Sequence, residues 1–346
     1  MQFSCFLPER THKRMNIGNT WPPRSRFFAM GATFVLCVAG SAGPALAQSK
    51  SSAAGNTDLE IPTVTVTAPK PPDPEQLVGD SVPRFIAAHG RPTVVTGQLA
   101  RWRASICPET LGLSPGFNSF VSARIGAVAA VVGAPHGEQG HCKVNVRILF
   151  TSEPKQVIGE IVKRDPAFLG FHYAQQTQRA ATFDHPIQGW YMTATQGDRG
   201  NIALDNPNPI QQTTAALNSP VARALQSGTT PGGRAGTRLA TGQDSLLVHA
   251  LVIVDTKGVS GYPIGSISDY LAMLVLSQTR SPDACGPLPS ILDLMAMHCG
   301  TEKKPEAVTA GDLAFLRALY SMDLRENLSL ETNDIQNAMM REFKSH

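Results

Sequence analysis

A nearly unbroken apolar run, LLVHALVIVDT from Leu246 to Thr256, limits the fold more than any other feature of the sequence. Its length and its β-branched residues predict a strand, and a strand that is apolar on both faces must be covered on both faces. The run is therefore predicted to lie in the centre of a sheet. Further strands are predicted over Gln98 to Ile106, Val144 to Phe150 and Pro186 to Thr195.

Helical segments alternate with these strands and follow them. The clearest one begins at Ser114 as N-cap and Pro115, ends before Gly133, and has apolar residues at spacings of three and four. The same patterns predict helices over Gln76 to His89, Pro154 to Lys163, Ile264 to Gln278, Pro289 to Met297, Thr309 to Tyr320 and Ser329 to Phe343. This order of elements predicts an α+β fold, with a mixed sheet, packed helices and a helical C-terminal tail.

The N-terminus has the layout of a secretory signal. A basic flank precedes an apolar stretch from Phe27 to Ala42, and a helix-breaking Gly-Pro then leads to small residues that end at Ala47. We expect residues 1–47 to be removed by cleavage between Ala47 and Gln48, which makes the mature protein periplasmic or secreted. The alternative is an uncleaved anchor, which needs about 20 apolar residues. This stretch is shorter, so no stable membrane span is expected after cleavage. Met1 and Met15 are alternative translation starts.

Removal of the signal changes the charge of the protein. The full chain has 30 Lys+Arg and 27 Asp+Glu residues, and five of the former and one of the latter lie in residues 1–47. The mature chain therefore keeps 25 basic and 26 acidic residues, a net charge near −1. Such a chain lacks the cationic surface that nucleic-acid binding requires, so this class of function is excluded.

Four cysteines remain in the mature chain: Cys107, Cys142, Cys285 and Cys299. An even number in an exported protein predicts two disulfides, and four cysteines allow three connectivities. Proximity along the chain favours Cys107–Cys142 and Cys285–Cys299. A zinc site with four thiolates is the alternative, but the chain has no C-x-x-C pair.

The mature chain is predicted to consist of a tether and one folded domain. Residues 48–72 are small, polar and then proline-rich, and cannot bury enough apolar surface to fold. Residues 73–346 are predicted to form a single α+β domain with a mobile insertion at about 205–244. Within the tether, Ile61 to Pro69 alternates β-branched residues with threonine, as expected of a strand that can add to the sheet of a partner.

Two local motifs were considered as catalytic or metal sites. Ser152 and Lys155 match the S-x-x-K pattern of penicillin-binding enzymes, but the K-T-G strand is absent, so a role in helix capping is favoured. Capping is also predicted for two later pairs, Thr309 with Asp312 and Ser329 with Thr332. His136 and His141 flank a glutamate beside Cys142 and are candidate ligands for zinc or copper. The glycines between them favour a surface turn, so no cofactor is expected.

Three segments together resemble a family of exported bacterial proteins to which no activity is assigned. They begin at Cys107 (CPETLGLSPGFNSFVSARI), at His185 (HPIQGWYMTAT) and at Val254 (VDTKGVSGYPIGSISDYLAMLVLSQ, followed by PLPSILDLM and VTAGDLAFLRALY). The resemblance covers about residues 60–343. It implies export and a shared fold, and no activity.

The tail is also similar, more weakly, to the end of metzincin-type peptidases. In that family a zinc-binding helix is followed by a methionine turn and a closing helix, and here SIL-x-x-M ends in Met295. The similarity implies that Ile264 to Gln278 replaces the zinc helix, which requires H-E-x-x-H. This segment offers Asp269 and no histidine, so the implied relative is a scaffold without zinc or hydrolysis. Asp269 is then expected to be a helix-surface carboxylate and Met295 a core residue.

The first functional hypothesis is a non-enzymatic envelope protein with a binding role. The segment PTVTVTAP, within Ile61 to Pro69, is similar to the TonB box of outer-membrane receptors, which adds a strand to an envelope partner. The alternative is a hydrolase of unrecognised type, with the long polar insertion as its lid. Asp255 or His249 would then converge with His172 or His185. Otherwise His249, inside the apolar run, is predicted to be a hydrogen-bonded core residue.

Overall fold

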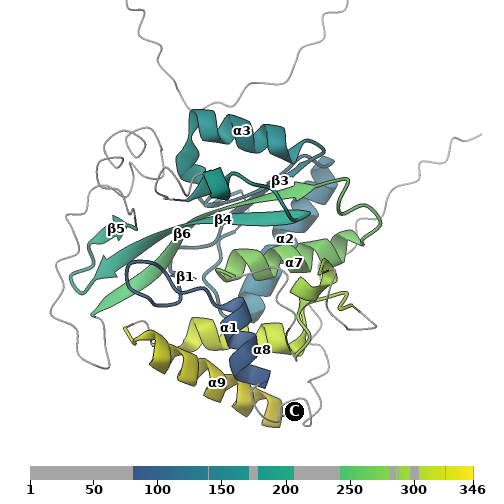
Figure 1. The fold of residues 1–346 in the computed structure, drawn as a ribbon. Helices are drawn as coiled ribbons and strands as arrows, with labels where there is room; N and C mark the ends of the chain where they lie inside the picture. Colours follow the sequence, from purple (N-terminus) through teal and green to yellow (C-terminus); the bar gives the residue numbers. More distant parts are fainter. Residues whose placement is uncertain are drawn as a thin grey trace, which may run out of the picture. The chain divides into compact units, whose positions relative to one another are not determined.

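The apolar run forms strand β6, Gln243–Asp255, and the prediction that it is central in a sheet is confirmed. A computed structural model describes residues 81–138, 140–170, 178–205, 242–279, 286, 288–296, 304–323 and 325–345 (Figure 1). All of these residues lie in one compact unit, Leu59–His346. Within this unit, helices pack on a sheet with parallel and antiparallel strands, as predicted for an α+β fold.

In the described residues, the sheet contains five strands besides β6: β1 (Arg101–Trp102), β2 (Pro108–Leu111), β3 (Val146–Thr151), β4 (Ile187–Gly197) and β5 (Ile202–Leu204). Three of them, β1, β3 and β4, pair with β6. β4 pairs antiparallel with β6 along almost its whole length. β1 pairs parallel with β6 at Leu246 and Leu247, and β3 does so from Ala250 onward. The order across the sheet is β2-β3-β6-β4-β5, so β6 is flanked by other strands on both edges.

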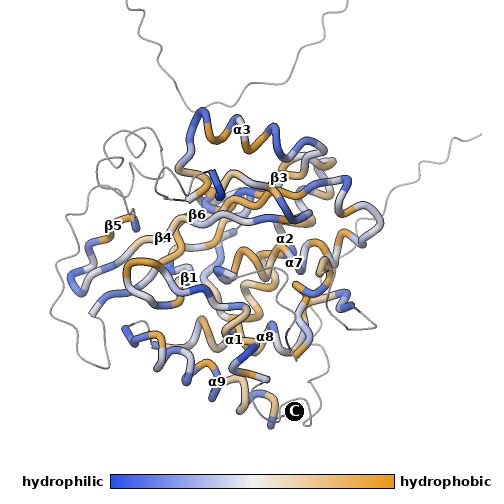
Figure 2. The backbone as a smooth tube through the Cα atoms, viewed as in Figure 1, coloured by the Kyte–Doolittle hydropathy of each residue, from blue (hydrophilic) through white to orange (hydrophobic). Residues whose placement is uncertain are grey.

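Helices cover both faces of this sheet. They are α1 (Ser81–His89), α2 (Pro115–Val131), α3 (Pro154–Arg164), α7 (Ile264–Leu276), α8 (Ala310–Ser321) and α9 (Leu328–Lys344), with the 3-10 turns η2 (Pro166–Leu169) and η4 (Ile291–Leu294). Ile148 and Val252 pack with α2 and α7 in the main core, whereas Leu251 and Ile253 pack with α3 and η2. Figure 2 shows the apolar residues along the central strands and α7. Among the described helices, none has the length and apolar character that a membrane span needs.

The capping box predicted for α8 is confirmed, and it also ties α8 to η4. Thr309 Oγ1 accepts from the N–H of Asp312 at 3.1 Å, and Asp312 Oδ2 accepts from the N–H of Thr309 at 2.8 Å. The carboxylate of Asp312 also accepts from the hydroxyl of Ser290 at 2.6 Å and from the N–H of Ile291 at 2.8 Å. Burial raises the pKa of Asp312. One buried carboxylate therefore holds two elements together.

The caps predicted for two other helices are wrong. The first turn of α9 is capped by Asn327, whose Oδ1 accepts from the N–H groups of Ser329 and Leu330 at 3.1 and 3.2 Å. Asn327 caps the helix in place of Ser329, because the oxygen of its short side chain reaches both N–H donors. Ser152 is also not a cap, because the N-cap of α3 is Glu153, whose side chain makes no capping hydrogen bond.

Other element boundaries also differ from the predictions. Ser114 is at the N-cap of α2 as predicted, but its hydroxyl makes no capping bond. Of the strand predicted over Gln98 to Ile106, only β1 forms, because Leu99 still pairs with Pro92 across the preceding turn. The helix predicted over Pro289 to Met297 is only the short η4 in its described part. Of the insertion predicted at about 205–244, Asp244 belongs to β6, and residues 206–241 lie outside the described residues.

Asp269 lies in the core, so the prediction that it is a helix-surface carboxylate is wrong. Its side chain is 1% exposed and pairs with Arg124 of α2, whose Nη2 donates to Oδ2 at 2.9 Å and whose Nε donates to Oδ1. The N–H of Val308 also donates to Oδ2, at 3.1 Å. Because α7 is buried almost along its whole length, a carboxylate on it must find a cation and donors. Met295 is buried, as predicted.

The predicted disulfide between Cys107 and Cys142 is confirmed, with Cα atoms 5.9 Å apart. It joins the residue before β2 to the loop before β3, at the end of the sheet where both strands begin. The second predicted pair, Cys285–Cys299, lies outside the described residues.

Replacing Asp269 by alanine should strongly destabilise the protein, because the guanidinium of Arg124 would lose its buried partner. We expect the free energy of unfolding to fall by about 3–5 kcal/mol, measured by urea denaturation with tryptophan fluorescence as the signal. The exposed pair of Glu160 and Lys163 provides the control, and Glu160→Ala should leave the midpoint unchanged. Equal stability of wild type and D269A would contradict the structural role of the buried pair.

Candidate functional site

Two adjacent apolar residues, Val94 and Val95, are conspicuously exposed. Their exposed fractions of 89% and 56% are the largest among the large apolar residues in the described part of the chain. They lie at the tip of residues 91–99, between α1 and β1, a segment that we call the valine turn. Single exposed apolar residues are common on protein surfaces, but an adjacent pair at a protruding tip calls for a functional explanation.

The backbone of the valine turn is closed by its own hydrogen bonds. Pro92 and Leu99 pair across its base, and the N–H of Thr93 donates to the carbonyl of Gln98 at 2.8 Å. The N–H of Gly97 donates to the carbonyl of Thr93 at 3.0 Å. Gly97 has a φ of 72°, a left-handed conformation that glycine adopts without strain. The local sequence therefore specifies a tight turn.

Hydroxyl groups fix the turn to the start of β6. The hydroxyl of Ser245, which is 2% exposed, lies 2.8 Å from Thr93 Oγ1 and also bonds to Thr96 Oγ1. The two threonine hydroxyls are 2.9 Å apart, and the N–H of Gln98 donates to Thr96 Oγ1 at 3.2 Å. These bonds restrict the backbone beneath the two valines to one conformation. A partner that bound the tip would therefore lose little entropy in ordering it.

Below the turn, a buried arginine fastens the C-terminal segment to the sheet. Arg101 of β1 is 3% exposed and donates to the carbonyls of Leu319, Met322 and Asp323 at 2.7, 3.2 and 2.9 Å. Burial lowers the pKa of Arg101, and the carboxyl group of Glu331 opposes this shift. The guanidinium thus joins β1 to the end of α8 and to the residues that follow it.

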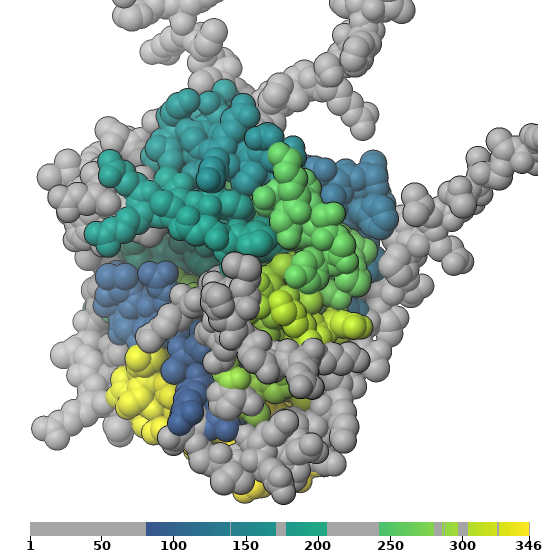
Figure 3. Space-filling model, turned by 45° about the vertical axis from the view of Figure 1, so that its right-hand side comes forward, coloured from purple at the N-terminus to yellow at the C-terminus, as the bar shows by residue number. Residues whose placement is uncertain are grey.

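α9 meets the valine turn through one buried glutamate. Glu331 Oε2 accepts from the N–H of Leu99 at 2.8 Å, and Oε1 lies 3.7 Å from Arg101 Nη2. Nearby, Gln98 Nε2 donates to the carbonyl of Glu326 at 2.7 Å. Burial raises the pKa of Glu331 to about 7, against the opposing effects of the Leu99 N–H and Arg101. In Figure 3 the dark-blue surface at the N-terminal end of the described chain lies against the yellow surface of α9.

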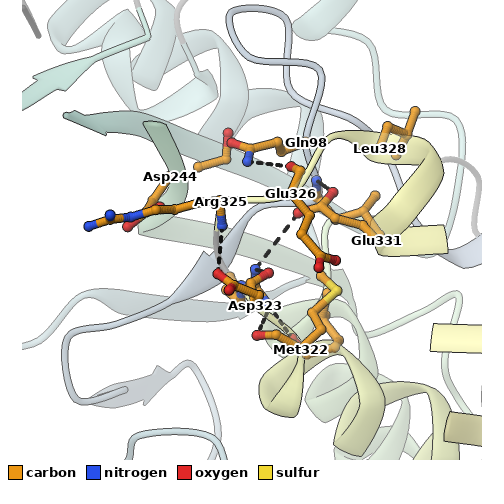
Figure 4. Close-up of polar contacts among 12 residues, drawn as sticks. Gln98, Asp244, Met322, Asp323, Arg325, Glu326, Leu328 and Glu331 are labelled. Atoms are coloured by element: carbon orange, nitrogen blue, oxygen red, sulfur yellow. Dashed lines mark hydrogen bonds and ion pairs between the residues drawn. The ribbon is translucent and has the colours of Figure 1, made fainter. Parts of the chain in front are cut away.

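Asp244 and two arginines form the rim of this region. Asp244, 6% exposed, pairs with Arg103 at a distance of 3.3 Å between Oδ2 and Nη1. Figure 4 shows the side chain of Arg325 extending toward Asp244. Burial raises the pKa of Asp244, and the positive charges of Arg103, Arg325 and Arg101 oppose that shift. Exposed cationic groups therefore lie close to the base of the valine turn.

The valine turn and the polar groups beneath it are suited to presenting Val94 and Val95 to a partner. The hydroxyls of Thr93, Thr96 and Ser245 bond to one another, and the guanidinium of Arg101 is occupied by backbone carbonyls. Across the described ranges, no group of three or more histidine, cysteine, aspartate or glutamate side chains could hold a metal ion. The site consists of an apolar tip on a rigid polar base.

The candidate metal ligands His136 and His141 lie in the loop before β3. His136 Nδ1 is 3.2 Å from the carbonyl oxygen of Ala134, and the N–H of His141 donates to the carbonyl of Glu138 at 3.1 Å. Cys142 is bonded in the disulfide and cannot act as a thiolate ligand. The His136 side chain therefore contacts a nearby backbone carbonyl, and no metal cluster is found in the described part of the loop.

Among the described residues considered for a hydrolase, His249 lies apart from Asp255. His249 is 1% exposed, its ring centroid lies 5.0 Å from that of Phe168, and burial lowers its pKa to about 4. It is a core residue as predicted, but its Nδ1 has no hydrogen-bond partner among the described residues. Asp255 lies six positions further along β6, about 20 Å away along an extended strand. The ring of His185 stacks on Tyr270, at a centroid distance of 6.3 Å.

The remaining predicted positions lie partly inside and partly outside the described residues. Ser152 and Lys155 are described, and both are exposed at the start of α3. The positions outside the described residues are Ala47, Gln48, Ile61 to Pro69, His172, Cys285 and Cys299.

The valine turn and Glu331 were not among the predicted functional residues, although both leave a signal in the sequence. The run PTVVTG, from Pro92 to Gly97, places two valines between turn residues rather than in a strand. In α9 the buried residues Ile335, Met339 and Phe343 recur every four positions, and Glu331 continues that series toward the N-terminus. A carboxylate in line with an apolar stripe indicates a buried and partnered group.

Comparison with protein-family models, with curated proteins and with solved structures finds no match for this chain. The resemblances to an exported family and to metzincin-type peptidases stay predictions. Function has to be argued from the site itself, since fold class alone does not specify it.

Replacing Ser245 by alanine should loosen the valine turn, because both threonine hydroxyls lose a partner. We expect the amide of Gly97 and its neighbours to exchange hydrogen about tenfold faster than in the wild type, as the loss of one to two hydrogen bonds implies. Hydrogen exchange read by mass spectrometry measures this change. Ser122→Ala removes a similar hydroxyl pair, with Thr110, and should leave the turn unaffected. Unchanged exchange in S245A would show that the turn is not held by this cluster.

Proposed function

We propose that this chain is an exported bacterial protein of the periplasm or the outside medium that works by binding a protein partner, and not by catalysis. The observation that carries the proposal is the valine turn, a hydrogen-bonded element that exposes two adjacent apolar residues. Apolar residues that are already held in place before the partner arrives lose little conformational entropy on binding. Val94 and Val95 fit that description.

The disulfide and the N-terminal sequence support export. Cys107 and Cys142 are bonded in the described structure, and disulfides persist in oxidising compartments such as the bacterial periplasm. The basic flank, apolar stretch and small residues up to Ala47 are typical of a cleaved signal. The two features are independent of each other and favour the same compartment.

The surroundings of the turn favour a particular partner. Val94 and Val95 lie above a base that carries the exposed arginines Arg103 and Arg325. An apolar pocket whose rim is acidic would complement both features, because charged rims improve encounter and orientation while the apolar centre supplies affinity. We propose a second contact through Ile61 to Pro69, which the sequence suits to strand addition.

The hydrolase alternative is less well supported. It requires His249 or Asp255 to meet a further titratable group in one place. His249 is enclosed between β6 and the η2 side of the sheet, whereas Asp255 is at the far end of the strand and accepts from the N–H of Lys257 at 3.0 Å. A zinc-free scaffold related to metzincin-type peptidases is compatible with the binding role, because it also lacks hydrolytic chemistry.

Intact mass analysis of the unreduced, exported protein should show a mature chain that begins at Gln48 and a linked pair of peptides that contain Cys107 and Cys142. A second linked pair is expected for Cys285 and Cys299. The double variant Cys107→Ser/Cys142→Ser should lose about 4 kcal/mol of unfolding free energy, given the sequence separation of 35 between the cysteines. Free thiols at both positions, or residues before Gln48 on the exported chain, would contradict the proposal.

A photo-crosslinking residue at Val94 should form a discrete adduct with a protein in the envelope of the native host. The same residue at Val131, which is 39% exposed on α2, is the control and should form no such adduct. Val95→Asp should remove the Val94 adduct without lowering the melting temperature, because the valine is mostly solvated. A third position, Val64, tests the tether separately. Identical patterns at Val94 and Val131, or none at Val94, would refute binding through the turn.

A further inference from the structure

We infer that α9 is a pH-sensitive clasp, fastened to the valine turn and β1 when Glu331 carries a proton and loosened when this carboxyl group ionises. The inference goes beyond the proposed function and does not depend on it, because it concerns how the C-terminal helix is held. The observations that carry it are the burial of Glu331 and the geometry of its contacts.

Glu331 is the only described carboxyl group that links α9 directly to the chain around β1. Its side chain is 0% exposed, and one oxygen accepts from the N–H of Leu99 at 2.8 Å. The other oxygen, Oε1, has no hydrogen-bond partner among the described residues. The guanidinium of Arg101 is 3.7 Å away from it, beyond hydrogen-bond length, and its N–H groups donate to three backbone carbonyls instead. A charge on Glu331 is therefore incompletely compensated.

The charge of Glu326 opposes the ionisation of Glu331 further. Glu326 lies just before the Asn327 cap of α9, and its carbonyl holds Gln98. Figure 4 shows Asp323, Glu326 and Glu331 gathered where the end of α8 meets the start of α9. The titratable and charged groups on the elements around Glu331 are Arg101 and Arg103 of the β1 segment, Asp244 of β6, Tyr320 of α8, Asp323, Arg325 and Glu326 of the connection, Asp334 of α9, and Arg84 and His89 of α1.

The direction of the pH effect follows from these contacts. Burial raises the pKa of Glu331 to about 7, and the charge of Glu326 contributes in the same direction. Burial also raises the pKa of Glu326, and Asp334 adds to that shift. A carboxyl group whose pKa is higher in the folded state stabilises that state fully below its unfolded pKa, and this contribution is lost as the pH rises through the folded pKa. The clasp is therefore closed in mild acid and weakened above about pH 7.

Hydrogen exchange of the full chain at pH 5, 6, 7 and 8, corrected for the intrinsic exchange rate, tests the inference. Protection of peptides from α9 should fall by roughly one to two orders of magnitude between pH 5 and pH 8, while peptides from α2 serve as an internal reference. Glu331→Gln, a neutral residue of the same shape, should give a flat profile. A wild-type profile that is already flat, or an unchanged profile in E331Q, would overturn the clasp.

Two further variants keep the test decisive if E331Q does not fold. Glu326→Gln removes the nearest like charge, so the pH of half-maximal protection should move downward from its wild-type value. Glu342→Gln is the matched control, because Glu342 is on the same helix, pairs with Arg317 and is 23% exposed. It should leave the profile unchanged. A midpoint that is the same in E326Q as in wild type, or a shift of equal size in E342Q, would also overturn the inference.

Discussion

The burial of β6 on both faces is the constraint on which the rest of the structure depends. Because β6 has apolar side chains on both faces from Leu246 to Val254, α2 and α7 cover one face and α3 with η2 the other. Its two edges are closed by β4 on one side and by β1 and β3 on the other. Three of the polar residues of β6, Gln243, Asp244 and Ser245, are its first three residues, and the candidate site forms at this end of the strand.

Buried charges in this chain hold helices in place. Asp269 needs Arg124 because α7 is otherwise apolar, and Asp312 serves both the first turn of α8 and η4. The Nη1 and Nη2 groups of Arg101 donate to three backbone carbonyls, although its Nε has no hydrogen-bond partner among the described residues. These charged groups are used to join elements of the structure, and a group whose bonds are made within the protein has little capacity left to bind or transform a substrate.

Much of the fold could be predicted from the sequence, because the decisive patterns were local. The β6 run, the helix after Ser114 and the capping box of Thr309 each contain their own start, period or end. β2 could not be predicted, because Pro108–Leu111 has no strand pattern and becomes a strand only by lying parallel to β3. The charge of Asp269 alone predicts a surface position, whereas the apolar residues around it in the sequence indicate a buried helix.

The site was harder to predict than the fold because its parts are far apart in the sequence. The valine turn is held by Ser245 and by Glu331, which come from β6 and α9, and neither contact leaves a trace in the turn's own sequence. This arrangement has a thermodynamic consequence. If a partner binds the ordered turn and a proton closes the clasp beneath it, each must strengthen the binding of the other by the same factor. Ser245 would hold the turn even with α9 loosened, so the coupling is expected to be at the lower end of the usual range of about 1–3 kcal/mol.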